Sequence, residues 1–264
     1  MSFLSAILDH KRAEVQRCRE SVPIEAMPSP VLPARDFAAA LGKPGVSVIA
    51  EIKRKSPSRG FMAEHADAAK IASSYDRGGA AAISVLTDQH FFGAASDDLI
   101  TAKRATSLPI LRKDFIIDPY QIHQSVHMGA DAVLLIVAVL NDSRLSEFIR
   151  LAGELGLQTL VEVHTEQELE QAIAADAPII GVNSRDLTTF AIDPKVCQRL
   201  RPFIPADRLA VAESGIQSQE DVSRLADAGY DAVLVGRALM EATDPARRLE
   251  QLTGRVLTKR GTQG

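Results

Sequence analysis

One unit recurs along the chain: a short apolar segment of strand length, a polar loop, and a segment with helical spacing. Alternation of strand and helix at intervals of ~20 to 30 residues predicts a parallel sheet. Eight such units in 264 residues favour a closed (β/α)8 barrel over an open doubly wound sheet, and no GxGxxG follows any strand. The first strand begins near Ser47, and the others are expected at 80–86, 108–111, 132–136, 158–161, 179–182, 209–212 and 232–235.

The segment before the first strand is predicted to be helical. Apolar residues recur at helical spacing over residues 3–15 among charged ones, which is typical of an amphipathic helix and not of a signal peptide. A Pro-rich passage over 22–33 follows, and then a short helix around 36–41. We therefore expect residues 1–45 to form an N-terminal helical extension packed on the barrel, and residues 46–264 to form the barrel as a single domain.

Two helix starts carry capping signatures. Thr165 with Glu168 predicts a capping box, in which each side chain binds the backbone N–H of the other residue, and Ser218 with Asp221 predicts a weaker version. Gly156 and Gly229 are expected to be left-handed C-terminal caps, and Gly129 is expected just beyond the end of the helix that begins at Asp118-Pro119.

The charge balance limits the possible partners. A net charge of −4 argues against a nucleic-acid binder and against a polybasic membrane binder. Cys18 and Cys197 are the only cysteines and lie far apart in the sequence, which argues against a disulfide framework or a zinc cluster and favours a reducing, cytoplasmic setting. The longest apolar run, 132–140, is shorter than the ~20 residues that cross a bilayer.

The end of the first strand carries two opposite charges. Glu51 and Lys53 point to the same side, because side chains alternate along a strand with period two. They could form a mutually satisfied ion pair, since buried charge is costly unless it is paired. The alternative, which the recurrence of such residues favours, is a strand end that opens into a polar pocket. A Ser-Pro-Ser-x-Gly loop with little regular structure is expected to follow.

Polar side chains also follow the other strands, whereas no such cluster is expected before them. In a parallel barrel the carboxyl ends of all strands share one face, and active sites lie there. Lys113 and Glu162 each end an otherwise apolar strand, so a catalytic role is predicted for both, whereas Arg112 has the opposite parity and should face away. The polar groups are Arg112-Lys113-Asp114, Glu162, His164, Asn183-Ser184-Arg185, Glu213-Ser214-Gly215 and Gly236-Arg237.

Three of these positions have a second interpretation. Glu213 could pair with a neighbouring lysine inside the barrel. His164 is expected to orient a backbone group or to cap a helix. Asn183 could serve a turn, but its place beside Arg185 at a strand end favours contact with a ligand.

Glycines follow the last two strands. Ser214-Gly215 and Gly236 match the phosphate site of barrels, in which the loops after strands seven and eight present backbone N–H groups. Glycine is suited to this role because a Cβ would keep the backbone away from the anion. The pattern predicts a phosphate site.

With these residues assembled, the chain resembles the indole-3-glycerol phosphate synthase family of tryptophan biosynthesis. The resemblance extends from about Ser47 to Met240, and the family also has an N-terminal helical extension. The motifs are VIAEIKRKSPSRG, SVLTDQHFFG, LPILRKDFIIDPYQI, LVEVH, IIGVNSRDL and VAESGI, in this order.

The resemblance implies roles residue by residue. Lys113 is implied as the general acid that protonates a ketone and then a leaving hydroxyl, Glu162 as its partner base, and Glu51 as a supporting carboxylate. Phe92 and Phe115 are implied to line an aryl pocket. Implied substrate contacts come from Lys53, Ser56, Asn183, Arg185, Glu213 and Ser214, and implied phosphate contacts come from Ser214 and from the backbone of Gly215, Gly236 and Arg237.

The implied reaction converts 1-(2-carboxyphenylamino)-1-deoxyribulose 5-phosphate to indole-3-glycerol phosphate. Loss of carbon dioxide restores aromaticity without an electron sink, so no cofactor and no metal are implied. A lysine acid needs a pKa suited to the working pH. Lys53 and Arg185 would lower the pKa of Lys113, whereas Glu51, Glu162 and the substrate phosphate would raise it, so the direction of the shift depends on distances.

Two positions depart from the family's pattern. Ser184-Arg185-Asp186 stands where members are more often rich in asparagine, and Arg237 stands where many have a small or acidic residue. Because the implied phosphate contact there is a backbone N–H, Arg237 should not abolish binding, and it could add a cation near the anion.

Other functions stay open on the sequence alone. The chain could be another phosphosugar barrel, an isomerase or a Schiff-base aldolase that uses Lys113. It could also be a catalytically silent phosphate-binding barrel that acts as a regulator, although the presence of both Lys113 and Glu162 argues against this. The expected partner is a small phosphosugar–anthranilate substrate, with no nucleic acid and no membrane, and the chain is expected to be a monomer or a weak homo-oligomer.

Overall fold

A computed structural model describes residues 3–254 apart from 31, 57–59, 65 and 188. Eight parallel strands close into a barrel, because the first strand pairs with both the second and the last. The predicted (β/α)8 fold is therefore confirmed. In barrel order the strands are β1 (Ser47–Ile52), β4 (Ala82–Leu86), β5 (Ile110–Lys113), β6 (Ala132–Ile136), β7 (Gln158–Val163), β8 (Ile179–Asn183), β9 (Leu209–Glu213) and β10 (Ala232–Val235).

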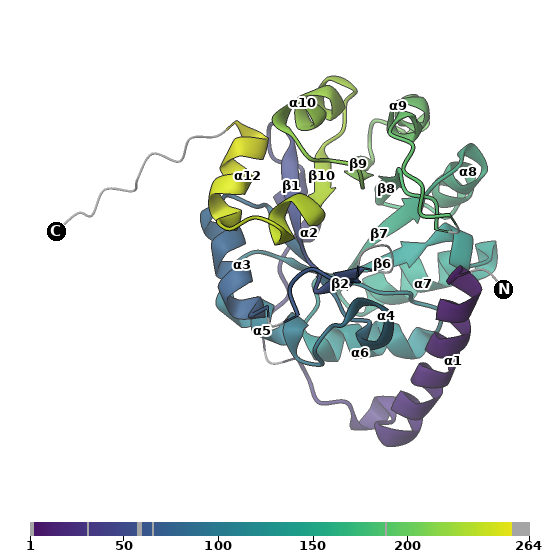
Figure 1. Ribbon diagram of the computed structural model, residues 1–264. Coiled ribbons are helices and arrows are strands. Elements are labelled where there is room, and N and C mark those ends of the chain that lie inside the picture. The colour runs from purple at the N-terminus through teal and green to yellow at the C-terminus, as the bar shows by residue number, and fades with distance from the viewer. Residues whose placement is uncertain (1–2, 31, 57–59, 65, 188, 255–264) are drawn as a thin grey trace.

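Helices surround the barrel, as Figure 1 shows. They follow the strands in the chain, so each βα loop opens at the same end of the barrel. The helical segments after β1 are α3 (Ala68–Arg77), α4 (Gln89–Phe92), α5 (Asp98–Ala105), α6 (Pro119–Met128), η2 (Val137–Val139), α7 (Asp142–Glu154), α8 (Glu166–Ala174), α9 (Lys195–Leu200), η3 (Arg201–Phe203), α10 (Gln219–Asp227), α11 (Arg237–Met240) and α12 (Pro245–Thr253).

One predicted strand is shifted in a way that matters for the site. The segment expected at 108–111 is β5, which starts at Ile110 and ends at Lys113. Pro109 has no N–H for the ladder, so regular pairing begins only after it. Lys113 is the last residue of β5, in agreement with the prediction that it ends an otherwise apolar strand.

Strand alternation separates the two sides of the barrel wall. Ile49, Leu111, Leu160 and Val211 point inward and form part of the buried apolar cluster inside the barrel. Two residues further along their strands lie Glu51, Lys113, Glu162 and Glu213, which by the same parity also face inward. An apolar layer therefore supports a charged layer at the carboxyl ends.

Arg112 has the opposite parity and faces the surrounding helices, as predicted. Its guanidinium donates to the backbone oxygen of Gln121 at 2.9 Å and to Oδ2 of Asp114 at 3.0 Å. Both partners are buried, which satisfies the charge between β5 and α6.

The capping predictions are half right. Ser218 and Asp221 form a reciprocal capping box, which was predicted to be the weaker one. Thr165 accepts from the N–H of Glu168, but the Glu168 carboxylate accepts from His164 N, so no reciprocal box forms. The left-handed glycines are confirmed, with φ of 76° at Gly156 and 91° at Gly229, and Gly129, which follows the end of α6 as predicted, is also left-handed at 86°.

The expectation that polar groups gather at one end of the barrel only is wrong. Asp131 precedes β6, is buried, and accepts from Lys103 Nζ at 2.6 Å and from the N–H of Ile110 at 2.7 Å. Asp231 precedes β10 and accepts from the N–H of Ala210 at 2.8 Å. Each aspartate thus ties the start of its own strand to the neighbouring strand at the end remote from the βα loops.

The N-terminal segment contacts both ends of the barrel. It contains α1 (Phe3–Ser21), η1 (Ile24–Ala26) and α2 (Phe37–Leu41). The side chains of Phe37 and Leu41 are fully buried in the inner apolar cluster, while the start of α1 reaches the opposite, βα-loop end. The predicted helices are present, and the division of the chain at residue 45 stays a prediction.

The loop after β1 was predicted to have little regular structure, and this is wrong. β2 (Lys55–Ser56) pairs antiparallel with β3 (Gly60–Phe61), and the ammonium of Lys55 lies 5.4 Å from the ring centre of Phe61. The middle of the Ser-Pro-Ser-x-Gly motif, 57–59, lies outside the described residues.

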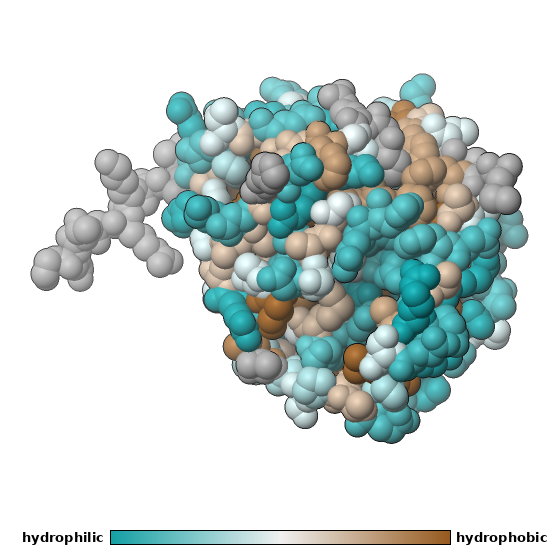
Figure 2. Space-filling model, turned by 60° about the horizontal axis from the view of Figure 1, so that its bottom comes forward, coloured by the Kyte–Doolittle hydropathy of each residue, from teal (hydrophilic) through white to brown (hydrophobic). Residues whose placement is uncertain are grey.

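Both cysteines are free, in agreement with the absence of a disulfide framework predicted from their spacing. Among the residues described, no helix combines the length and the apolar character needed to cross a membrane. The face shown in Figure 2 is mostly hydrophilic, with hydrophobic side chains exposed in small groups.

Candidate active site

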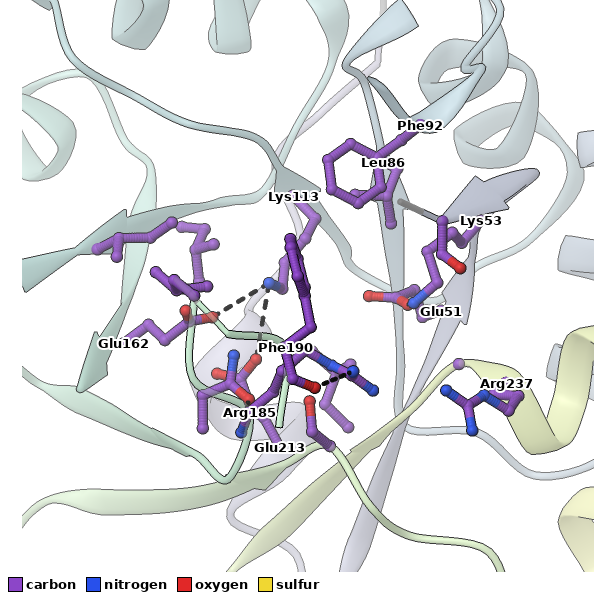
Figure 3. Close-up of a pocket in the computed structure, with 18 of the residues that line it drawn as sticks. Glu51, Lys53, Leu86, Phe92, Lys113, Glu162, Arg185, Phe190, Glu213 and Arg237 are labelled. Atoms are coloured by element: carbon purple, nitrogen blue, oxygen red, sulfur yellow. Dashed lines mark hydrogen bonds and ion pairs between the residues drawn. The ribbon is translucent and has the colours of Figure 1, made fainter. Parts of the chain in front are cut away.

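One cavity lies at the carboxyl ends of the barrel strands and collects the predicted site residues (Figure 3). They reach it from β1, β5, β7, β8 and β9 and from the loops that follow the strands. The residues predicted from the sequence that line this cavity are Glu51, Lys53, Ser56, Phe92, Lys113, Phe115, Glu162, Asn183, Arg185, Glu213, Ser214, Gly215, Gly236 and Arg237.

Lys113 lies between two buried carboxyl groups (Figure 3). Its Nζ is 3.1 Å from Oε2 of Glu162 and 3.7 Å from Oε2 of Glu213. Burial favours the neutral amine, but the charges of Glu162, Glu213 and Glu51 outweigh it and raise the pKa of Lys113 above its ordinary value of 10.5. The geometry thus settles the sign that the sequence left open, and Lys113 is an ammonium at neutral pH.

Glu162 is held as a carboxylate by two cations. Burial alone would raise its pKa, but Lys113 and His164 together lower it. His164 Nε2 is 3.4 Å from Oε1 of Glu162, and its Nδ1 is 3.1 Å from Oε2 of Glu168. Burial would lower the pKa of His164, and these two carboxylates raise it to about 10. The ring therefore orients the Glu162 carboxylate and not a backbone group, which differs from the prediction.

Glu213 pairs with a lysine, as one interpretation of the sequence held, but that lysine is Lys113 itself. Burial and the nearby charge of Glu162 raise the pKa of Glu213 to about 8. A Cβ at Gly181 would overlap the Glu213 carboxyl group, so the glycine leaves the space that this side chain occupies. At neutral pH the cavity therefore holds an ammonium, a carboxylate and a carboxylic acid side by side.

The Glu213→Gln substitution is expected to change how stability depends on pH. The folded pKa of Glu213, about 8, exceeds its ordinary value of 4.5, so its stabilising contribution is complete at low pH and is lost as pH rises through about 8. Glutamine does not titrate. Between pH 5 and pH 9 the wild type should therefore lose more free energy of unfolding than the variant, by on the order of 1 kcal/mol or more.

Urea unfolding at both pH values measures this difference. Other titrating groups are common to the two proteins and cancel. If the free energy of unfolding differed between variant and wild type by the same amount at pH 5 and pH 9, the pKa of Glu213 would lie near its ordinary value.

Glu51 and Lys53 fit both interpretations offered for them. They form an ion pair with each other, and both side chains line the cavity. A Cβ at Gly236 would overlap the Glu51 carboxylate and would lie 3.2 Å from Lys53 Nζ. The absence of a side chain at Gly236 thus makes room for this pair, a reason that sequence reasoning did not supply.

The loop after β9 has an unusual backbone. Ser214 has φ of 67° and Gly215 has φ of 78°, so two successive residues are left-handed. A serine in this conformation is strained, and such strain is concentrated at functional sites. Arg185 and Arg237 line the same cavity, and burial, together with repulsion from Arg237, lowers the pKa of Arg185. Two guanidinium groups that repel each other beside an open turn favour the binding of an anion.

The family model of indole-3-glycerol phosphate synthase matches residues 4–252 of the chain. The chain belongs to the indole-3-glycerol phosphate synthase family. The synthase of Chlorobium phaeovibrioides (strain DSM 265 / 1930) is 46% identical over 249 residues, which cover 92% of this chain and 96% of that protein. The synthase of Rhodococcus opacus (strain B4) is 46% identical over 256 residues, which cover 96% and 95%. The family predicted from the motifs is confirmed.

Solved structures with the same architecture are more distant. 3-Hexulose-6-phosphate synthase has a TM-score of 0.61 at 14% identity, covering 80% of this chain and 100% of its own. A chain of the tryptophan synthase complex from Pyrococcus furiosus has a TM-score of 0.56 at 16% identity, covering 79% and 97%. At these identities the likeness shows the barrel fold alone.

In this member of the indole-3-glycerol phosphate synthase family, the loop after β8 folds over the cavity. The N–H of Arg185 donates to Oδ1 of Asn183 at 3.0 Å, and the Arg185 guanidinium donates to the backbone oxygen of Phe190 at 3.0 Å. Phe190 has φ of 58° and lines the cavity with Ile192. Sequence reasoning missed Phe190, since an aromatic residue in a polar loop was its only signal.

The apolar wall of the cavity has two sources. Phe92 and Phe115, predicted for an aryl pocket, have ring centres 6.3 Å apart with planes tilted by 32°. The other contribution comes from α1, whose residues Phe3, Leu4 and Ile7 also line the cavity. The helical pattern predicted that α1 packs on the barrel, but not that it completes the pocket of this family member.

Proposed function

We propose that the chain is an indole-3-glycerol phosphate synthase. It closes the ring of 1-(2-carboxyphenylamino)-1-deoxyribulose 5-phosphate with loss of carbon dioxide and water. The observation that carries the proposal is the ammonium of Lys113, held between Glu162 and Glu213 in one cavity with an anion-binding turn. The 46% identity to named synthases over nearly the whole chain supports it.

Lys113 acts as the general acid in this proposal. As the aryl carbon bonds to the ketone carbon, the ketone oxygen gains negative charge and takes a proton from the ammonium. The carbon–carboxylate bond then breaks and releases carbon dioxide. The electron pair of that bond restores the aromatic benzene ring. The hydroxyl then leaves as water after a second protonation, and the new five-membered ring becomes aromatic as it loses a proton from carbon. Glu213, which is protonated near neutral pH and lies 3.7 Å away, is the nearest group that can return a proton to Lys113.

Glu162 is the partner base, and Glu51 supports the site with a second carboxylate. Glu162 is ionised and lies within hydrogen-bond distance of Lys113, so it can take up a proton that the substrate loses. Glu51 lies on the other side of the cavity, paired with Lys53 (Figure 3). Phe92 and Phe115 provide an apolar surface for the anthranilate ring.

Substrate binding is assigned to the cations and the turn at the mouth of the cavity. Carboxylate and phosphate together give the substrate close to three negative charges, which matches the positions of Lys53, Arg185 and Arg237. Ser214, Gly215 and Gly236 present backbone to the phosphate. Asn183, which fixes the Arg185 backbone, and Ser56 on the hairpin complete the substrate contacts.

Replacing Gly215 by valine is expected to raise KM by roughly tenfold or more, equivalent to ~1.4 kcal/mol, and to lower kcat far less. A β-branched residue is strained at φ of 78°, and its Cβ would lie 3.1 Å from Ile192, so the turn must move. Steady-state kinetics separate the two constants. Gly156→Val is the control, because Gly156 is also left-handed, at 76°, but lies before β7 at the remote end of the barrel. A fall in kcat with unchanged KM would place the phosphate elsewhere.

A turnover assay on the carboxyphenylamino-deoxyribulose phosphate, followed by fluorescence of the indole product, tests the function. Failure to form the product would overturn it. A Schiff-base aldolase is disfavoured because an imine needs a neutral amine, whereas the pKa of Lys113 is raised. Borohydride with substrate present would trap an adduct on Lys113 only if that alternative were correct.

The wider setting follows from the same reaction. The substrate is a small phosphorylated molecule, so neither nucleic acid nor a membrane is needed as a partner. We place the protein in the cytoplasm, as a monomer or a weak homo-oligomer.

A further inference from the structure

A lysine of the N-terminal helix lies buried among carboxylates next to the catalytic strand ends. Lys11 is 0% exposed. Its Nζ lies 2.8 Å from Oδ2 of Asp88, 2.9 Å from Oδ1 of Asp114 and 3.0 Å from Oε2 of Glu14. Glu14 is on the same helix and partly exposed, whereas Asp88 and Asp114 are buried and belong to loops of the barrel. One ammonium thus joins α1 to two βα loops.

Both loops carry groups of the active site. Asp114 directly follows Lys113, and it also binds Thr87 Oγ1 at 2.7 Å and the N–H of Phe115 at 2.8 Å. Asp88 caps α4 by accepting from the N–H of Phe91 at 2.7 Å, and α4 contains Phe92. The two carboxylates that Lys11 binds therefore hold the backbone next to Lys113, the proposed acid, and next to Phe92 of the apolar wall.

The place of Lys11 in α1 shows that anchoring the helix does not require a charge. The buried residues of α1 are Ile7, Lys11 and Val15, spaced four residues apart along one stripe. An apolar side chain at the middle position would continue the stripe, and replacing a whole buried ion pair, the lysine together with its carboxylates, by apolar residues is often neutral or stabilising. What an apolar residue cannot do is bind the carboxylates of Asp88 and Asp114.

We propose that Lys11 is a positioning residue for the reaction: by binding Asp88 and Asp114, it fixes the backbone from which Lys113 and Phe92 enter the cavity. The inference rests on the proposed role of Lys113 as the acid. A displacement of ~1 Å at a reacting group can cost ~100-fold in rate, so a contact outside the cavity can control kcat.

The barrel offers a matched control in Lys103. This lysine is also buried and binds Asp131 with both oxygens at 2.6 Å, but it lies at the end remote from the cavity. Lys11→Met and Lys103→Met both remove a buried ammonium, and both should lower the free energy of unfolding. Only Lys11→Met should lower kcat, by roughly 10- to 100-fold at a temperature where circular dichroism shows both folded.

Two further measurements separate positioning from loss of structure. The inhibition constant of inorganic phosphate should stay within about twofold of wild type in Lys11→Met, because the turn at Gly215 follows β9, whereas Asp114 follows β5. The double variant Lys11→Met/Asp88→Asn removes the unpaired carboxylate, and asparagine still caps α4. Its free energy of unfolding should be higher than that of Lys11→Met, whereas its kcat should stay low.

The proposal is overturned if Lys11→Met, or the double variant where the single one does not fold, turns over at the wild-type rate. Equal losses of kcat in Lys11→Met and Lys103→Met would also overturn it, since they would reflect general loosening. These outcomes differ from failure of the proposed function, which would appear as an inactive wild type or a fully active Lys113→Ala.

Discussion

Lys113→Ala is expected to lower kcat at least ~100-fold, the scale typical of a positioned acid. The ammonium is the only group within 4 Å of both Glu162 and Glu213 among the ion pairs of the described residues, so no neighbour replaces it. The fold should persist. Glu213 is protonated near neutral pH, and Glu162 keeps its contact with His164, so no carboxylate is left without compensation. Single-turnover fluorescence with saturating substrate measures the chemical step.

Lys103→Ala is the control for loss of a buried ammonium, and it should keep kcat near the wild-type value. The inhibition constant of inorganic phosphate reports whether the substrate site of Lys113→Ala is intact. Near-normal turnover by Lys113→Ala would remove this lysine from the mechanism and leave Lys53, the other lysine that lines the cavity, as the candidate acid.

Glu162→Gln is expected to lower kcat by a similar factor, at least ~100-fold. Glutamine has the same size but cannot accept a proton at neutral pH. The wild-type carboxylate is kept ionised by Lys113 and His164, which lower its pKa, so the base is ready throughout the usual working range. The pH profile of kcat in the wild type should accordingly show no loss of the base between pH 5 and pH 8.

Glu168→Gln provides the comparison, because Glu168 is the second carboxylate on His164 but does not line the cavity. It should lose far less activity than Glu162→Gln. If the two variants were equally impaired, the charge around His164, and not proton transfer by Glu162, would explain the loss.

Much of the site could be predicted because it follows from two regular patterns. Period-two alternation places Glu51 with Lys53, and it places Lys113, Glu162 and Glu213 two residues beyond inward-facing apolar positions. Closure of the barrel then brings these distant strand ends to one face. Neither step needs knowledge of any contact between side chains, so the residue types and their order were sufficient.

The rest depends on distances between segments far apart in the chain. Lys11 binds Asp114 across 103 residues, and Phe190 reaches the cavity through a loop whose path no local pattern encodes. The direction of the pKa shift of Lys113 was open for the same reason, since it depends on how many carboxylates lie within a few ångströms. The capping box predicted at Thr165 does not form because the Glu168 carboxylate accepts from the backbone N–H of His164.

The aspartates that precede β6 and β10 bear on how such a barrel can be remodelled. Asp131 accepts from the first amide of β5, and Asp231 accepts from the second amide of β9, both at the end of the barrel remote from the cavity. These bonds fix the register of β6 against β5 and of β10 against β9 at the end of the barrel that does not bind the substrate. The βα loops at the cavity can then be lengthened or exchanged, by engineering or in evolution, without breaking the two aspartate hydrogen bonds that keep the strands aligned.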